Sequence, residues 1–88
     1  MTYDEAKRQT NLTKHGIDLA DCCAVFDAPM VTVEDDRCVY GEQRLRSLCW
    51  LNQRVVVLIW TDRDPIPHAI SCRYGDKNET SIYFKAVL

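Results

Sequence analysis

Apolar residues recur at helical spacing along residues 19–26, between Asp18 and Pro29. Asp18 is a residue type that caps helix N-termini, and proline cannot continue a helix, so the pattern predicts a helix between these two positions. One face of that helix is expected to pack into the core. The apolar stripe consists of Leu19, Cys22, Cys23 and Phe26, at positions i, i+3, i+4 and i+7.

A mostly polar segment precedes this stripe. Thr2, followed three residues later by Glu5, fits a capping box, which predicts a surface helix that continues to about Lys14. Gly16 can adopt the left-handed conformation that commonly ends a helix. The N-terminal part of the chain is therefore expected to form two helices.

The pattern changes from helical to extended after Pro29. Residues 43–51 alternate between two faces, whereas residues 54–61 are apolar on both faces, which is typical of a central strand. The chain is thus predicted to be a single α+β domain, 1–88, with two N-terminal helices and a four-stranded antiparallel sheet. The expected strands are 30–33, 43–51, 54–61 and 68–73, with an acidic loop at 34–42 and turns at 52–53 and 62–65.

Two patterns overlap at the C-terminal end. Asp76 and Glu79 fit a second capping box, whereas residues 80–88 are rich in the β-branched and aromatic types that favour strands. A short C-terminal helix is the preferred interpretation, with a strand as the alternative.

Composition and charge narrow the class of protein. The 88 residues carry a net charge of −2, and no apolar run is long enough to span a membrane. The acidic, polar N-terminus is unlike a secretory signal, so a cytoplasmic protein without membrane contact is expected. Residues 37–88 hold eight basic and five acidic side chains, so a nucleic-acid phosphate would bind in this half.

The five cysteines are odd in number and include no CxxC pair. Small buried hydrophobes in a reducing compartment are therefore the favoured interpretation. No metal and no other cofactor is predicted. A zinc site that includes His15 and Cys22 is the weaker alternative, because structural zinc sites usually contain closely spaced ligand pairs.

The chain contains no phosphate-binding glycine loop, HExxH helix or nucleophile elbow. A metal-free ribonuclease needs less than these motifs. It requires a base for the 2′-hydroxyl, an acid for the leaving oxygen and cations for the charged phosphorane. Arginine, histidine and glutamate side chains near predicted strand ends and loops could supply such groups.

Several short motifs, in their order along the chain, resemble the BrnT toxin family (DUF497). They are Tyr3-Asp4-Glu5-Ala6-Lys7, Asn11-Leu12-Thr13-Lys14-His15-Gly16-Ile17, Tyr40-Gly41-Glu42-Gln43-Arg44, Trp60-Thr61-Asp62-Arg63 and Ile70-Ser71-Cys72-Arg73. The resemblance implies a RelE-like fold and a ribonuclease toxin of a type II toxin–antitoxin pair, which arrests growth. It also implies a BrnA-like ribbon-helix-helix antitoxin as partner, with operator DNA bound only through that antitoxin.

The chain departs from the family pattern in three places. Cys49 stands where the family usually has glycine, and His68 stands where an arginine often precedes the IS-x-R strand. Residues 75–84, usually rich in arginine and lysine, hold only Lys77. The last departure favours an alternative function: a binding module that keeps the fold and the antitoxin contacts but is catalytically weak or inactive.

Arg63 and Arg73 lie near the ends of adjacent predicted strands and match arginines of the family, so they are expected to hold the scissile phosphate. His15 or Glu42 is expected to move protons. Structural alternatives stay open: His15 as a helix cap, Arg63 in a surface ion pair, and Glu42 in a salt bridge with Arg44. The residues expected to bind RNA are Lys14, Arg44 and Arg46.

Overall fold

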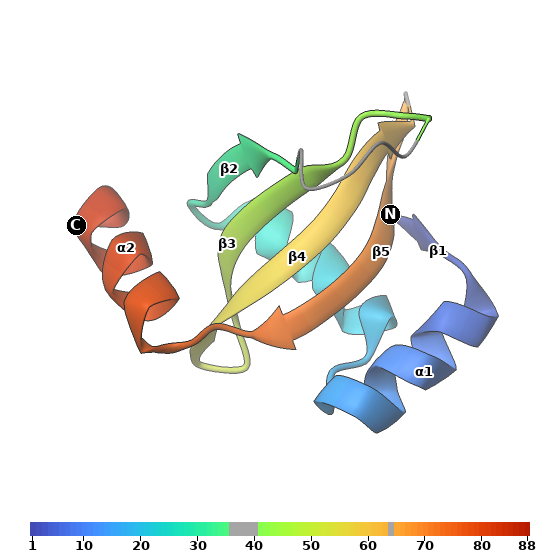
Figure 1. Ribbon diagram of the computed structural model, residues 1–88, viewed down its shortest axis with the longest axis horizontal. Coiled ribbons are helices and arrows are strands. Elements are labelled where there is room, and N and C mark those ends of the chain that lie inside the picture. Colours follow the sequence, from blue (N-terminus) through green and yellow to red (C-terminus); the bar gives the residue numbers. More distant parts are fainter. Residues whose placement is uncertain (36–40, 64) are drawn as a thin grey trace.

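The computed structural model describes residues 1–35, 41–63 and 65–88. Within these ranges five strands form one sheet in the order β1-β5-β4-β3-β2, with helices around it (Figure 1). No helix of the described residues is both long and apolar enough to cross a bilayer. The strands are β1 (Thr2–Tyr3), β2 (Val31–Glu34), β3 (Leu45–Leu51), β4 (Arg54–Arg63) and β5 (Ile66–Tyr74), and the helices are α1 (Glu5–His15), the 3₁₀ helix η1 (Leu19–Asp27) and α2 (Lys77–Val87).

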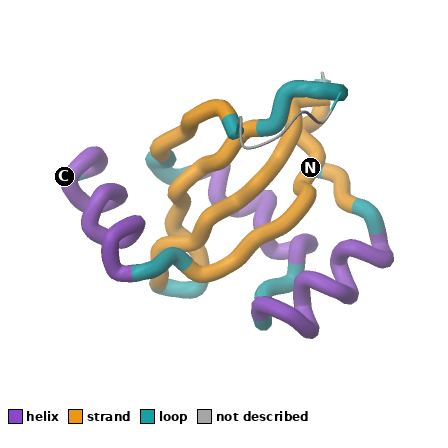
Figure 2. Tube along the Cα trace, viewed as in Figure 1, coloured by secondary structure: helices purple, strands orange, loops and turns teal. Residues whose placement is uncertain are grey.

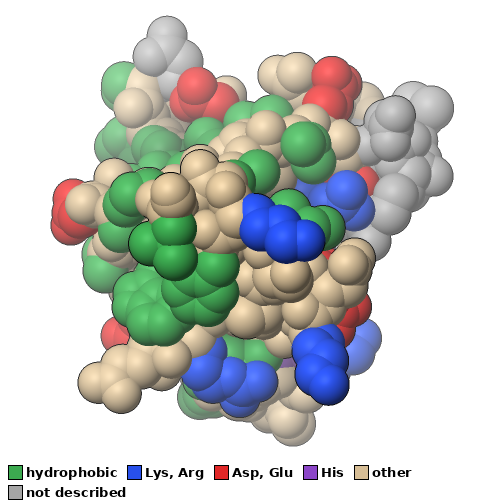
Figure 3. Space-filling view, turned by 90° about the vertical axis from the view of Figure 1, so that its left-hand side faces the viewer, with side chains coloured by type: hydrophobic (Ala, Val, Ile, Leu, Met, Phe, Trp, Pro, Cys, Tyr) green, Lys and Arg blue, Asp and Glu red, His purple; other side chains and the backbone are tan. Residues whose placement is uncertain are grey.

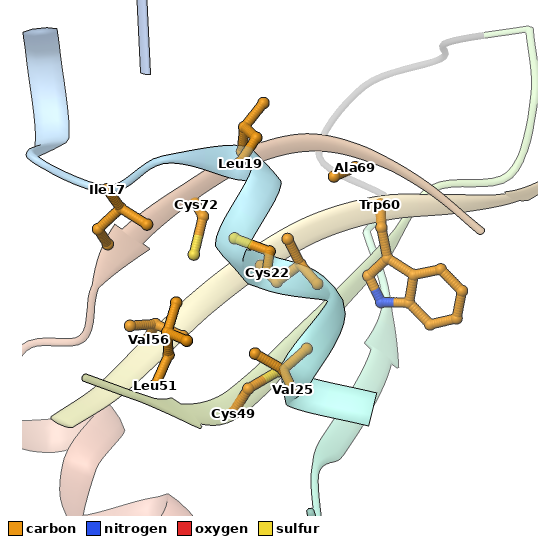
Figure 4. Close-up of a cluster of buried hydrophobic side chains, with 11 residues drawn as sticks. Ile17, Leu19, Cys22, Val25, Cys49, Leu51, Val56, Trp60, Ala69 and Cys72 are labelled. Carbon is orange, nitrogen blue, oxygen red and sulfur yellow. The ribbon is translucent and has the colours of Figure 1, made fainter. Parts of the chain in front are cut away.

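In the part of the chain that the structure describes, helix η1 covers one face of the sheet, whereas α1 and α2 lie only along the two sides of the other face (Figure 1 and Figure 2). Helix η1 lies behind the sheet in Figure 1, where the main core cluster forms between it and β3, β4 and β5 (Figure 4). The opposite face, here called the open face, lies between α1 on one side and α2 on the other (Figure 2). The side chains of Val57, Ile59 and Ile70 form a small apolar cluster on the open face, with Leu48 packed against it.

Strand β4 lies in the middle of the sheet, as the apolar run at 54–61 predicts. The alternation of β3 is also confirmed, since Ser47, Cys49 and Leu51 are buried toward the core. Ser47 is the polar exception there. Its hydroxyl accepts a hydrogen bond from the indole nitrogen of Trp60 at 2.9 Å and shares another with the hydroxyl of Thr32 at 2.7 Å, which offsets the cost of burial.

The expected four-stranded antiparallel sheet is wrong. The sheet is mixed and has five strands, because Thr2–Tyr3 pairs in parallel with His68 and Ala69 of β5. These residues therefore do not begin a helix. Asp4 caps α1 instead, and its carboxylate accepts a hydrogen bond from the backbone amide of Lys7.

The second predicted helix forms, but with a different period. Residues Leu19, Cys22 and Val25 are buried at intervals of three, which matches the three residues per turn of a 3₁₀ helix. Cys23, expected on the apolar stripe, is exposed. The sequence pattern does not distinguish a 3₁₀ helix from an α-helix, because apolar residues spaced at i and i+3 fit both kinds of helix.

The predicted loop and turns differ from the structure in extent. Asn52 and Gln53 form the expected hairpin turn, both with positive φ, as a type I′ turn requires. The expected turn at 62–65 is much tighter, because Asp62 and Arg63 still pair with β5. Residues 36–40 of the expected acidic loop and Asp64 lie outside the described residues. The C-terminal segment is a helix, and both halves of its Asp76–Glu79 capping box are present.

Asn11 attaches helix α1 to the edge of strand β5. Its side-chain amide accepts a hydrogen bond from the backbone amide of Cys72 at 2.9 Å and donates to the carbonyl of Cys72 at 2.9 Å. It also donates to the carbonyl of Ile17 at 2.8 Å. Asn11 is only 4% exposed and is the buried residue of an otherwise polar helix. The side chain thus continues the edge pairing of β5 beyond the two-residue strand β1.

Replacing Asn11 with alanine should lower the free energy of unfolding by about 2–3 kcal/mol, because two buried backbone groups of Cys72 lose their partners. Asn11→Asp should also destabilise, since a carboxylate can accept but not donate. Urea denaturation measures both effects. The exposed Thr13→Ala, on the same helix, is the control and should change stability by less than about 0.5 kcal/mol. Equal stability of Asn11→Ala and the control would show that α1 is held by other contacts.

Candidate functional site

The open face presents side chains in rows that cross β3, β4 and β5. One row contains Leu48, Val57 and Arg73, and the next contains Arg46, Ile59 and Ser71. The apolar members lie mainly on the central strand, whereas the cationic and hydroxyl groups lie on its neighbours. An extended polyanion could therefore lie across β4 with cations on both sides.

Glu79 holds Arg73 in place. The two terminal nitrogens of the arginine donate to the two carboxylate oxygens of Glu79, at 2.8 and 2.9 Å. Glu79 also accepts from the backbone amide of Asp76, as the third residue of α2. The hydrogen bonds from Arg73 lower the pKa of Glu79 to about 2. The side chain of Arg73 remains 42% exposed, so a ligand can still reach this fixed cation.

A hollow of about 410 Å³ lies between α1 and β5. Lys7, Lys14 and His15 reach it from the helix and Ser71 from the strand, around a floor that includes Ile70. Partial burial lowers the pKa of His15, and the charges of Lys14 and Arg73 lower it further. The imidazole is thus largely neutral at pH 7 and able to accept a proton. The residue that caps the C-terminus of α1 is Gly16 rather than His15. Gly16 has a φ of 74°, and its backbone amide donates to the carbonyl of Leu12.

A second cluster lies at the turn between β4 and β5. Arg63 donates to a carboxylate oxygen of Glu42 at 3.0 Å, and this hydrogen bond lowers the pKa of Glu42. His68 lies close enough that both residues influence its pKa, which is lowered mainly by burial. Its Nδ1 is 2.8 Å from the hydroxyl of Thr2 on β1. Arg44 adds a further positive charge near Glu42.

The two predicted phosphate-binding arginines lie far apart. Arg73 pairs with Val57, whereas Arg63 pairs with Ile66 at the other end of the same ladder. Six residues of extended strand separate Val57 from Arg63, a distance of about 20 Å. Arg63 and Arg73 are indeed near the ends of adjacent strands, but antiparallel pairing puts these ends at opposite sides of the sheet. One phosphate cannot contact both.

The structure therefore divides the expected residues into two groups. His15, Lys14, Arg46 and Arg73 lie near one end of the open face, and Glu42, Arg44 and Arg63 lie near the other. Three residues of the site were missed in the sequence analysis: Lys7, Ser71 and Glu79. The position of Lys7, seven residues before Lys14 on the same helix face, is a signal that could have identified it. Ser71 could have been identified from its position two residues before Arg73 on the same strand. No sequence signal links Glu79 to Arg73.

The thiols of Cys22, Cys49 and Cys72 are buried in the core behind the sheet (Figure 4). Burial raises the pKa of Cys49 to about 12, and a hydrogen bond with Cys22 followed by burial raises that of Cys72. These thiols are poor nucleophiles and pack as small hydrophobes. Within 1–35, 41–63 and 65–88, no three histidine, cysteine or acidic residues are grouped as metal ligands. Cys38 lies outside those ranges.

A small α+β domain with cations on an uncovered sheet face has the features of a protein that binds a polyanion such as RNA. The chain belongs to the BrnT family: the family model described as "Ribonuclease toxin, BrnT, of type II toxin-antitoxin system" matches residues 3–79. This match confirms the resemblance carried by the short motifs. Its description assigns to the family RNA as substrate and an antitoxin as partner. A comparison with curated proteins found no match.

The Arg73–Glu79 ion pair should make stability depend on pH in the acid range. Glu79 has a folded-state pKa of about 2, below its ordinary value of 4.5, so its contribution is present above pH 4.5 and is lost as pH falls toward 2. Glu79→Gln should therefore destabilise the protein by roughly 1–2 kcal/mol at pH 7, and the difference from wild type should disappear near pH 2.

Urea denaturation between pH 2 and 7 measures this dependence. Glu5→Gln is the matched control, because Glu5 pairs with Arg8 at 2.9 Å on the exposed surface of α1. Its effect on stability should be much smaller at every pH. A Glu79→Gln curve parallel to that of wild type across the whole range would contradict a stabilising ion pair.

Proposed function

We propose that this chain is a metal-independent endoribonuclease that cleaves RNA on its open face and thereby arrests growth. The observation that carries the proposal is that His15 and Lys14 of α1 line one hollow with Ser71 of β5, and that Arg73, two residues further along β5, is close enough for its charge to lower the pKa of His15. Family membership supports RNA as the substrate. The partner is proposed to be a ribbon-helix-helix antitoxin that also binds the operator DNA, which the toxin contacts only through it.

Cleavage proceeds by attack of a ribose 2′-oxygen on the adjacent phosphorus. Neutral His15 accepts the proton of the 2′-hydroxyl, the bond from phosphorus to the 5′-oxygen breaks, and a 2′,3′-cyclic phosphate forms. Solvent, which reaches this open site, protonates the leaving oxygen. The phosphorane carries more negative charge than the ground state, so the fixed guanidinium of Arg73 stabilises the transition state preferentially. The protein's own cation thus supplies the electrostatic stabilisation.

The second cluster is proposed to bind RNA away from the cleaved phosphate. Arg63 is 52% exposed, and its hydrogen bond lowers the pKa of Glu42, which makes Glu42 a weak base and a poor proton donor at neutral pH. At about 20 Å from Arg73, this cluster is several nucleotides distant. Lys14 and Arg46 are proposed to contact the RNA backbone at the Arg73 end of the open face, near the cleaved phosphate.

One observation favours the alternative of a weak or inactive binding module. Arg73 is already bound by two hydrogen bonds to Glu79, and this neutralising partner competes with phosphate for the guanidinium. A protein that keeps this pair in the presence of RNA would bind without efficient cleavage.

The rate of RNA cleavage by purified, antitoxin-free protein should depend on Arg73. Arg73→Ala should lower kcat by about 10²–10³-fold, as expected for the loss of one transition-state donor. Arg63→Ala should raise KM and leave kcat nearly unchanged, because Arg63 contacts the RNA far from the phosphate that is cleaved. Cleavage of a fluorescently labelled RNA in EDTA-containing buffer measures both, and the activity of the wild-type protein should persist there.

Glu79→Gln is the matched control for Arg73→Ala, because it removes the same ion pair but keeps the cation. It should retain kcat within about tenfold of wild type. Equal loss in the two variants would assign Arg73 a purely structural role. If Arg63→Ala alone lost kcat, the site would be the other cluster, and loss of activity in EDTA would reject metal independence. Wild-type protein that binds RNA without cutting it would establish the binding-module alternative.

A further inference from the structure

Large apolar side chains are exposed together on the α2 side of the molecule. Figure 3 shows this side, with hydrophobic side chains gathered into one patch and lysine and arginine side chains beside it. A small protein rarely exposes such a cluster unless another molecule covers it. The cluster, called here the α2 patch, comprises Val33, Trp50, Ile82, Phe84 and Leu88, which are between 37% and 94% exposed.

Helix α2 is attached to the sheet by few contacts of its own. Tyr83 is its one buried residue, and its hydroxyl donates to the carbonyl of Pro29 at 3.0 Å. The Tyr83 ring stacks on Trp50 with a centroid distance of 6.4 Å. The residues on either side of it in the chain, Ile82 and Phe84, are both exposed. A surface helix normally turns such residues to the core, so α2 presents apolar surface that its own domain does not bury.

Two of the hollows that border this helix lie beside the α2 patch. The one toward the open face, called here the α2–β2 groove, has a volume of about 300 Å³. Its lining is apolar at Val31, Val33, Leu48 and Ile82, with Arg46 and Glu79 at its polar end. The other, of about 310 Å³, is lined by Pro29, Trp50, Phe84 and Val87 among others. The α2–β2 groove therefore connects the α2 patch with the cations of the open face.

We propose that the α2 patch and the α2–β2 groove bind a segment of the antitoxin that combines apolar side chains with carboxylates. The proposal rests on the antitoxin partner of the family and adds where, and by what chemistry, it binds. Apolar side chains fill the groove, and carboxylates of the same segment reach Arg46 and the cations beyond it. The bound segment then covers the open face, so RNA and antitoxin exclude one another.

The positive charge beside the α2–β2 groove favours the antitoxin, rather than a second copy of this chain, as the molecule that binds there. Two copies that met through this surface would bring their Arg46 side chains toward one another, because Glu79, the acidic residue of the groove, is already paired with Arg73. An acidic segment would instead find complementary charge beside an apolar groove. The same cations that hold RNA phosphates then hold carboxylates, which explains how one surface serves both ligands.

The test measures binding of the cognate antitoxin to full-length variants of this chain. Ile82→Glu places a carboxylate in the groove and should weaken binding by 30-fold or more. Leu12→Glu is the matched control, because Leu12 is equally exposed, at 42% against 44%, but lies on α1. It should change the dissociation constant by less than threefold. Thermal unfolding of both variants reports whether they remain folded.

Hydrogen exchange of the wild-type complex gives an answer that needs no variant. Binding should protect amides in 31–34 and 77–87, and unchanged exchange there would overturn the proposal. So would a loss of affinity in Leu12→Glu but not in Ile82→Glu, or a toxin homodimer that Ile82→Glu separates while antitoxin binding is unchanged. Because these readouts measure binding, a wild-type protein that fails to cleave RNA would refute the ribonuclease proposal alone.

Discussion

The hydrogen bonds between Asn11 and strand β5 determine where the first helix lies, and the placement of the candidate site depends on them. Strand β1 covers the edge of β5 only at His68 and Ala69, so the backbone of Cys72 needs another partner. Asn11 supplies it. Helix α1 is too polar to be held by hydrophobic packing alone. Its other strong attachment is the bidentate pair of Arg8 with Asp18, the residue that caps η1.

One turn beyond Asn11, the same helix carries Lys14 and His15 to the rim of the hollow, next to the strand that carries Ser71 and Arg73. On the other side of the open face, Glu79 links Arg73 to the start of α2. The hydrogen bonds of Asn11 to β5 and the ion pair of Glu79 with Arg73 thus bring α1, β5 and α2 together around the guanidinium of Arg73. The arrangement also contains a conflict. Glu79 fixes the guanidinium on the open face, yet it occupies both terminal nitrogens and its own charge opposes the binding of an anion.

Much of the fold follows from simple patterns. The apolar run of β4 identifies the central strand, the alternation of β3 identifies its core face, and the Asp76–Glu79 capping box identifies α2. Two features leave no such signal. A two-residue strand such as β1 is too short for any periodicity, and its parallel pairing depends on a tertiary contact. The 3₁₀ period of η1 becomes visible only when Val25, rather than Cys23, is seen to be buried.

The candidate site is less predictable than the fold. The motifs identify residues such as His15, Arg63 and Arg73 individually, but not their distances. Consecutive antiparallel strands run in opposite directions, so arginines near the C-terminal ends of β4 and β5 must lie at opposite ends of the β4–β5 pair. This follows from the predicted topology itself. The pairing of Arg73 with Glu79 does not, because it depends on how α2 turns back after Gly75.

The central claim is that RNA lies on the open face beside His15 and Arg73. The most direct measurement is a titration of ¹⁵N-labelled protein, followed by two-dimensional NMR, with a short RNA whose 2′-O-methyl groups prevent cleavage. The account predicts chemical-shift changes at 14–15, at Arg46 and at 70–73, with amides of η1 unaffected. Changes confined to η1 and the far side of α2, with the open face unchanged, would contradict it.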